Sequence, residues 1–497
     1  MLITDFRKLI YGSLITFSLN PIIFFFGFLW NMILTRILTP FDVGRYSLCI
    51  TIFGILAAIS NLGIDSFLFR HYPLLDKNTD IKGRRFLLLI SIFFPFLSGI
   101  LSGTFIFIFR YKINDILNTH LDNLLNIFLI ALPFYTVSYS LIKALLAEGY
   151  AFRAQLVNLL STRLIPFSIL LSLLKFKKIY NVNDVALIYS ISVILMFIVS
   201  IYWVNKYVCS FKGPFDKIFT IKEIFAFSIP IMFSSLFSIM FLWSDNLMLG
   251  ILSSSDNVAY YNMSYLLSAM IKNFSLLAIQ TLLLPILMKY YGESKNDNIV
   301  EVYGITSRLA FLISVPIALF FIIYRKEMLV YIFGNKYIIG HRVLEILSIM
   351  FLIRVSIGPI STIAIAYAKT PWIMISTFIV LILNVLGNYI LIPLIGIAGA
   401  ALCTGSSEIL SAILILFKLP IDFIRQFNKN IYRYVINLFI ASCIFYGSKL
   451  FYNDNLVNFL FSGILCTLIF YIIISKSPAI SKSDKELFKK LIKNLKN

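Results

Sequence analysis

Long apolar runs recur along the whole chain and constrain its fold more than any other feature. Each run has roughly 20 residues or more, which is the length that crosses a bilayer core as an α-helix. Only 13% of the 497 residues are charged, too few to cover a soluble surface of this size. The sequence therefore predicts an all-α polytopic membrane protein with about 14 transmembrane helices, at 9–34, 46–69, 86–109, 122–147, 153–175, 183–205, 221–250, 258–288, 303–324, 343–368, 372–391, 395–417, 431–450 and 455–475.

The distribution of lysine and arginine predicts the orientation of these helices. The formal net charge is +20, which in a soluble protein would suggest a nucleic-acid partner. Here the basic residues lie mostly in short loops, about twice as many on one side as on the other. The positive-inside rule then places both termini in the cytoplasm of a multi-pass protein, and nucleic-acid binding is disfavoured. The basic tail, 476–497, is predicted to be either a solvated segment or a short amphipathic helix on the inner leaflet.

A weak internal repeat predicts two related halves. The stretch "LTRILTPFDVGRYSL" (34–48) is echoed by "LMLGILSSSDNVAYYNM" (247–263). The two copies lie six predicted helices apart on the same side, so they indicate two six-helix lobes related by an axis along the membrane normal. From the N-terminus, the sequence predicts a lobe at 1–206, a second lobe at 207–420, two additional helices at 421–475 and the tail at 476–497.

Three sequence elements resemble the polysaccharide-exporting branch of the multidrug/oligosaccharidyl-lipid/polysaccharide (MOP) flippase superfamily. The first is "TRILTPFDVGRYSL" (35–48), followed by "NLGIDS" (61–66). The second is "WSDNLMLG" (243–250), leading to "VAYYNMSY" (258–265), where an alanine replaces the usual glycine. The third and most specific is "LNVLGNYILIPLIGIAGAALCT" (383–404). The chain is more similar to Wzx-type O-antigen and capsule flippases than to drug-extruding relatives.

The resemblance implies a transporter in the bacterial plasma (inner) membrane. Such proteins move undecaprenyl-pyrophosphate-linked oligosaccharide from the inner to the outer leaflet by alternating access between two lobes. The product would be O-antigen, capsule or exopolysaccharide, and a polysaccharide polymerase and chain-length machinery would be the expected partners. Two readings remain open, a cation-coupled multidrug exporter of the same fold and a membrane polysaccharide polymerase or ligase.

The motif residues also have a purely structural interpretation. Gly44 and Tyr46 suit a tight turn with an aromatic residue at the membrane interface, and Asp42 with Arg45 suits an interfacial salt bridge. The turn 393–396 would end one helix and reverse the chain. Small residues after that turn would allow close helix approach. These motifs therefore identify the fold rather than a site.

Charged residues inside the predicted helices are the best candidates for function, because each is costly to place at mid-membrane. Arg163, Lys272 and Arg354 lie close to the middle of their spans, and Glu408 does too. We expect the three cations to help line a cationic cavity that binds the substrate pyrophosphate. The alternative is that each cation pairs structurally, for example with Glu408, which is also a weaker candidate for ion coupling. Transport that is insensitive to the proton gradient would reject that coupling role.

Enzymatic chemistry has no signal in this sequence. It has no HExxH, no Walker A sequence and no Gly-x-Ser-x-Gly elbow, and no outer loop is long enough for a polymerase active site. The three histidines and five cysteines form no metal-binding spacing. The sequence predicts a protein that is not an enzyme, with no cofactor and no metal.

Overall fold

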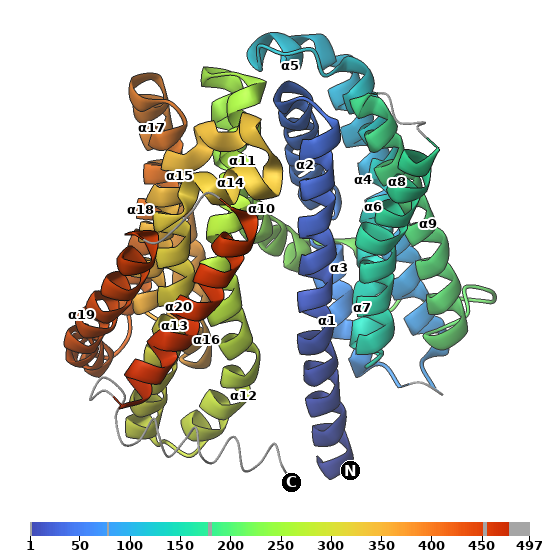
Figure 1. Ribbon diagram of the computed structural model, residues 1–497. Coiled ribbons are helices and arrows are strands. Elements are labelled where there is room, and N and C mark those ends of the chain that lie inside the picture. The colour runs from blue at the N-terminus through green and yellow to red at the C-terminus, as the bar shows by residue number, and fades with distance from the viewer. Residues whose placement is uncertain (1, 77–78, 177–180, 451–454, 477–497) are drawn as a thin grey trace. The chain divides into compact units, whose positions relative to one another are not determined.

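The computed structural model describes residues 2–76, 79–176, 181–450 and 455–476, and within these ranges it contains helices and no strand (Figure 1). By length and composition, 12 of the described helices can cross a membrane. The two remaining predicted spans, 9–34 and 258–288, fall on α1 and on one continuous helical stretch that contains α11 and α12. The predicted all-α membrane fold is therefore confirmed, while the predicted tail lies outside the described residues except for Lys476.

The chain divides into two compact units, Met1–Ala259 and Tyr260–Asn497. The first unit begins with ten α-helices and two short segments, and the first residues of α11 complete it. They are α1 (Leu2–Ile37), α2 (Pro40–Ser60), α3 (Ile64–His71), the 3-10 turn η1 (Tyr72–Leu74), α4 (Ile81–Ile108), α5 (Arg110–Ile116), α6 (Asp122–Ala147), α7 (Ala151–Leu159), the π-helical segment η2 (Leu160–Leu164), α8 (Ile165–Lys175), α9 (Val182–Tyr207) and α10 (Ile221–Leu252).

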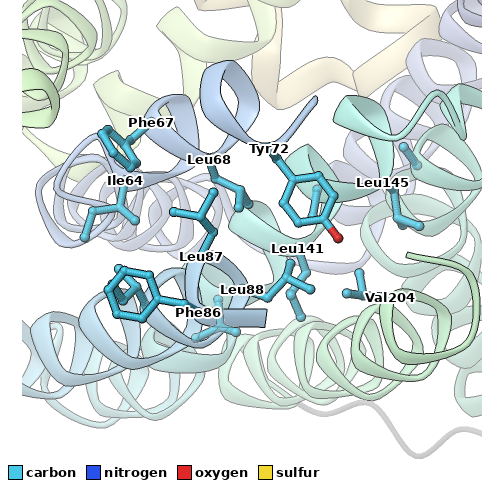
Figure 2. Packing of buried hydrophobic residues seen from close by; sticks show 14 of the residues in the cluster. Ile64, Phe67, Leu68, Tyr72, Phe86, Leu87, Leu88, Leu141, Leu145 and Val204 are labelled. Atoms are coloured by element: carbon cyan, nitrogen blue, oxygen red, sulfur yellow. The ribbon is translucent and has the colours of Figure 1, made fainter. Parts of the chain in front are cut away.

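The core of the first unit is built on α6, which packs against α2, α3, α4 and α9. Figure 2 shows one buried cluster of this core, in which Leu141 and Leu145 of α6 meet Leu87 and Leu88 of α4. The ring of Tyr72 lies between Leu68 and Leu145 in this view and is fully buried. Large apolar side chains from several helices therefore hold this end of the unit together.

The second unit contains the rest of α11, from Tyr260 on, and all later helices. They are α11 (Ser255–Lys272), the π-helical segment η3 (Asn273–Leu277), α12 (Ala278–Gly292), α13 (Asn296–Ile323), α14 (Arg325–Phe333), the 3-10 segment η4 (Asn335–Gly340), α15 (His341–Ser356), α16 (Ile360–Ala366), α17 (Thr370–Ile395), α18 (Ile397–Leu416), α19 (Ile421–Leu450) and α20 (Leu456–Lys476). Helix α13 packs against α12, α15 and α19, and α18 packs against α15 and α17. The predicted lobe boundaries remain a prediction.

The first copy of the repeat forms the start of a helix rather than a turn. Helix α2 begins at Pro40, and the side chain of Thr39 caps it by accepting a hydrogen bond from the Asp42 backbone. Gly44 and Tyr46 are thus helical and buried, so the predicted tight turn at these residues is wrong. Thr39 caps the helix and Pro40 occupies its first position, which favours helix initiation there. The helix therefore begins four residues before Gly44.

The two copies of the repeat occupy the same register in their helices. Tyr46 is the seventh residue of α2, and Tyr261 is the seventh residue of α11; both are buried. The predicted pair Asp42 and Arg45 forms a partly exposed ion pair with 3.3 Å between its atoms. The correspondence extends to Gly44, whose counterpart in α11 is Ala259.

Gly44 lies where the two copies of the repeat meet within the first unit. A Cβ atom added to Gly44 would lie 1.7 Å from the carbonyl oxygen of Ser255. Nearby, the Asn246 side chain of α10 donates a hydrogen bond to Thr51 of α2, at 3.0 Å. The glycine therefore permits a backbone approach that no other residue would allow.

The third family element forms a hairpin of α17 and α18. Helix α17 ends at Ile395, and Gly396 reverses the chain with φ of 64°. The sequence predicts the turn at 393–396, but Pro393 is still inside the helix, so the helix ends two residues later than predicted. Asn384 donates a hydrogen bond to Thr404 at 3.3 Å, and Asn388 donates one to Asn384 at 3.0 Å. Tyr261 also donates to Thr404, so this polar network joins α11, α17 and α18.

Replacing Asn384 with alanine is expected to destabilise the second unit by about 1 kcal/mol, because buried Asn388 and Thr404 both lose a partner. Thermal unfolding of the purified protein measures the effect. Leu386→Ala is the matched control on α17, since Leu386 is 54% exposed. Equal midpoints for the two variants would contradict the role of the network.

Candidate functional site

Lys272, Glu408 and Arg354 form an interior charge cluster in the second unit. The Lys272 Nζ atom lies 2.6 Å from Glu408 Oε1, and the Arg354 Nε atom lies 3.9 Å from Glu408 Oε2. The side chain of Arg354 is 9% exposed, and those of Lys272 and Glu408 are 18% and 21% exposed. Two cations thus share one carboxylate, and the cluster carries a net charge of +1.

Aromatic rings form one wall of this charge cluster. The Lys272 ammonium lies 4.5 Å from the centre of the Phe351 ring and 5.8 Å from that of Tyr265. These two rings pack edge to face. Ring faces are weakly negative, so they favour the lysine cation without neutralising its charge.

The span that carries Arg354 is broken immediately after this residue. Helix α15 ends at Ser356, and α16 begins only at Ile360. Arg354 Nη1 donates a hydrogen bond to the carbonyl of Gly358 at 3.1 Å, and Gly358 has φ of 78°. A cation in the last turn of a helix is favoured by the helix dipole. Broken helices of this kind place unpaired backbone groups at mid-membrane, where they can line binding sites.

The helix that carries Lys272 is also irregular at this level. The π-helical segment η3 begins at the next residue, and such segments are frequent at functional sites. The carbonyl of Ile271 accepts hydrogen bonds from Ser275 at 2.8 Å and from Ser314 of α13 at 3.1 Å. These hydroxyl groups satisfy a carbonyl next to the point where the regular hydrogen-bond pattern changes.

Arg163 lies in the first unit, within the π-helical segment η2. Its guanidinium group lies against Gly27 of α1, where an added Cβ would come within 3.0 Å of Arg163 Cζ. Among the described residues, its buried Nε atom has no hydrogen-bond partner. This arginine therefore offers an interior positive charge with a free donor.

The sequence-predicted residues thus separate into one cluster and one single cation. Glu408 contacts both Lys272 and Arg354, as in the structural alternative, while Arg163 belongs to the other unit. The break between α15 and α16 was missed, although the Gly358-Pro359 pair is a signal for it. The π-helical segments left no signal in the apolar pattern. Among the described residues, no group of histidine, cysteine and acidic side chains could hold a metal ion.

Two family comparisons match this chain. The family described as "Polysaccharide biosynthesis protein" matches residues 9–291, and the MatE family matches residues 230–390. The first match covers more than half of the chain and includes the first two sequence elements described above. The second includes Lys272, Arg354 and part of the third element.

Individual relatives agree with these matches. The chain is 25% identical over 293 residues to "Probable low-salt glycan biosynthesis flippase Agl15" of Haloferax volcanii, which is 58% of this chain and 60% of that protein. The fold is similar to "Lipid II flippase MurJ, inward closed conformation", with a TM-score of 0.75, 18% identity and coverage of 93% of this chain and 99% of the other. An inward-facing multidrug resistance MATE family transporter gives a TM-score of 0.66, 14% identity and coverage of 82% and 95%. The chain therefore belongs to the polysaccharide biosynthesis protein family.

Proposed function

We propose that the protein flips lipid-linked oligosaccharides from the inner to the outer leaflet of the bacterial plasma membrane by alternating access. The substrate is an undecaprenyl-pyrophosphate-linked repeat unit for O-antigen, capsule or exopolysaccharide. Both termini face the cytoplasm, in accord with the excess of lysine and arginine in the loops on that side. The relative named as a glycan biosynthesis flippase supports this class of substrate.

The net-positive charge cluster at a broken helix is the observation that carries the proposal. A pyrophosphate group carries at least two negative charges and loses its hydration in the bilayer core, so fixed cations must replace that hydration. Lys272 supplies a point charge and Arg354 a fork of donors, while Arg163 of the first unit offers its free donor. Glu408 is assigned as the counter-ion of Lys272 and Arg354 before the substrate binds. A cation-coupled exporter of cationic drugs would need the opposite excess of charge.

Deletion of the gene is expected to abolish surface polysaccharide and to cause accumulation of complete lipid-linked repeat units on the cytoplasmic leaflet. Extraction of the lipid-linked intermediates measures their amount. Their resistance to a glycosidase added on the periplasmic side measures which leaflet they occupy. Re-expression of the wild-type gene is the control.

Two other outcomes would reject the proposal. Single repeat units displayed on the outer surface of the deletion strain would indicate that the missing protein is a polymerase. Unchanged lipid-linked intermediates together with raised sensitivity to cationic drugs would indicate that the missing protein is a drug exporter.

A further inference from the structure

A second charge cluster lies at one end of the first unit, where α4 begins and α9 ends. A cavity of about 260 Å³ is found there. The polar residues that line it are Arg84, Arg85, Glu148, Tyr207, Cys209 and Ser210. The transport site described above uses none of these residues.

The charges around this cavity do not balance. Arg84 pairs with Glu148, and both side chains are 4% exposed. Arg85 is 7% exposed, and it donates hydrogen bonds to the neutral carbonyl groups of Ser210 and Pro214. In the described part of the chain, no carboxylate lies within ion-pair distance of Arg85. The cluster therefore carries a buried net charge of +1, which is costly unless an anion compensates it.

A free hydrogen-bond donor adds to this unbalanced charge. Arg84 Nε is buried and has no acceptor among the described residues. Its guanidinium group lies 4.4 Å from the centre of the ring of Tyr72, a member of the buried cluster in Figure 2. The cavity also reaches Ile81, the first residue of α4, where the positive end of the helix dipole favours a negative charge.

The position of the cavity along the chain places it at the level of lipid headgroups. Helices α4 and α9 are both candidate membrane spans, and the cavity lies at the end of each. More cations surround its mouth, since Arg153 lies 3.7 Å from the centre of the Tyr207 ring and Lys206 lies 5.4 Å from it. Basic pockets at the ends of membrane helices are typical binding sites for anionic headgroups.

We propose that this cavity binds the phosphate group of an anionic phospholipid headgroup. Arg85 supplies the uncompensated charge, and Arg84 supplies the free Nε donor. The same chemistry would accept a free phosphate ion, which is the other source of this ligand. The site is independent of the transported substrate, so it can be tested without a transport assay.

Cys209 provides a probe inside the cavity. The test uses the full chain with Cys209 as its sole cysteine, and a matched variant with only Cys443, which is exposed on α19. Each is reconstituted in vesicles of phosphatidylcholine, alone or with added phosphatidylglycerol, and is labelled with a neutral maleimide. Burial raises the pKa of the Cys209 thiol, so the two lipid compositions are compared at one fixed, mildly alkaline pH.

Phosphatidylglycerol is expected to slow labelling of Cys209 roughly fivefold, the factor reached when the ligand is at about four times its Kd. Labelling of Cys443 should not change. Protection in detergent by inorganic phosphate alone, with none from phosphatidylglycerol, would overturn the lipid assignment. No protection by either, or equal slowing at Cys443, would overturn the site itself.

Two variants test the charge balance. Arg85→Gln should remove the protection, measured as the ratio of labelling rates in the two lipids. Glu148→Gln raises the net charge to +2 and should bring full protection at a lower fraction of phosphatidylglycerol. If Arg85→Gln does not fold, Glu148→Gln still decides, because an unchanged lipid dependence in that variant contradicts the proposal.

Discussion

Replacing Arg354 with glutamine is expected to lower polysaccharide export by roughly 10- to 100-fold, because one hydrogen bond to a charged group contributes about 1.5–3 kcal/mol. Arg354→Lys should retain part of the activity, since it keeps the charge and loses the fork of donors. The initial rate of surface polysaccharide appearance in a complemented deletion strain measures both. Protein abundance in the membrane is measured in parallel. Arg425→Gln is the matched control, because Arg425 is exposed and, within the described part of the chain, forms an ion pair with Asp422 three residues away.

The double variant Arg354→Gln with Glu408→Gln separates binding from a structural role. If Arg354 only neutralises the carboxylate of Glu408, removal of both charges should restore export. If Arg354 binds the substrate, export stays low in the double variant even where protein abundance recovers. Restored export would therefore contradict the proposed role of Arg354.

Replacing Gly44 with alanine is expected to destabilise the first unit by about 1–3 kcal/mol, the usual cost of forcing an atom into a packed interior. The added Cβ would meet a backbone oxygen of Ser255 at 1.7 Å, and backbone cannot rotate away as a side chain can. The midpoint of thermal unfolding and the abundance in the membrane should both fall.

Gly447→Ala is the matched control for this effect. Gly447 is helical, and an added Cβ there meets nothing within 4 Å, so this change should be neutral or slightly stabilising. Equal unfolding midpoints for Gly44→Ala and Gly447→Ala would show that α2 and the start of α11 do not pack as described.

The architecture was largely predictable because one physical requirement dominates it. Every backbone group in the bilayer must be satisfied within its own segment, so apolar runs of sufficient length become helices. All fourteen predicted spans fall on described helical segments. The details were less predictable. A turn was expected at Gly44, because glycine and tyrosine suit both turns and close helix contacts, and the sequence does not distinguish a partner backbone from solvent.

The candidate site was predictable residue by residue but not as a cluster. The cost of a charge at mid-membrane identified Lys272, Arg354 and Glu408. Their contact joins residues more than 130 positions apart, from Lys272 to Glu408, and no spacing rule relates them. The cavity beside Arg84 was missed, because two adjacent arginines at the start of a span look like ordinary positive-inside residues.

The π-helical segments η2 and η3 have a geometric consequence for the helices that contain them. Each inserts about one residue beyond the α-helical repeat, so the side chains after it are turned by about 100° relative to an uninterrupted α-helix. A helical wheel drawn through Leu160–Leu164 or Asn273–Leu277 would therefore assign later residues to the wrong side. Each helix is in effect two cylinders joined end to end with an angular offset. Residues before and after the joint present their polar and apolar faces in different directions.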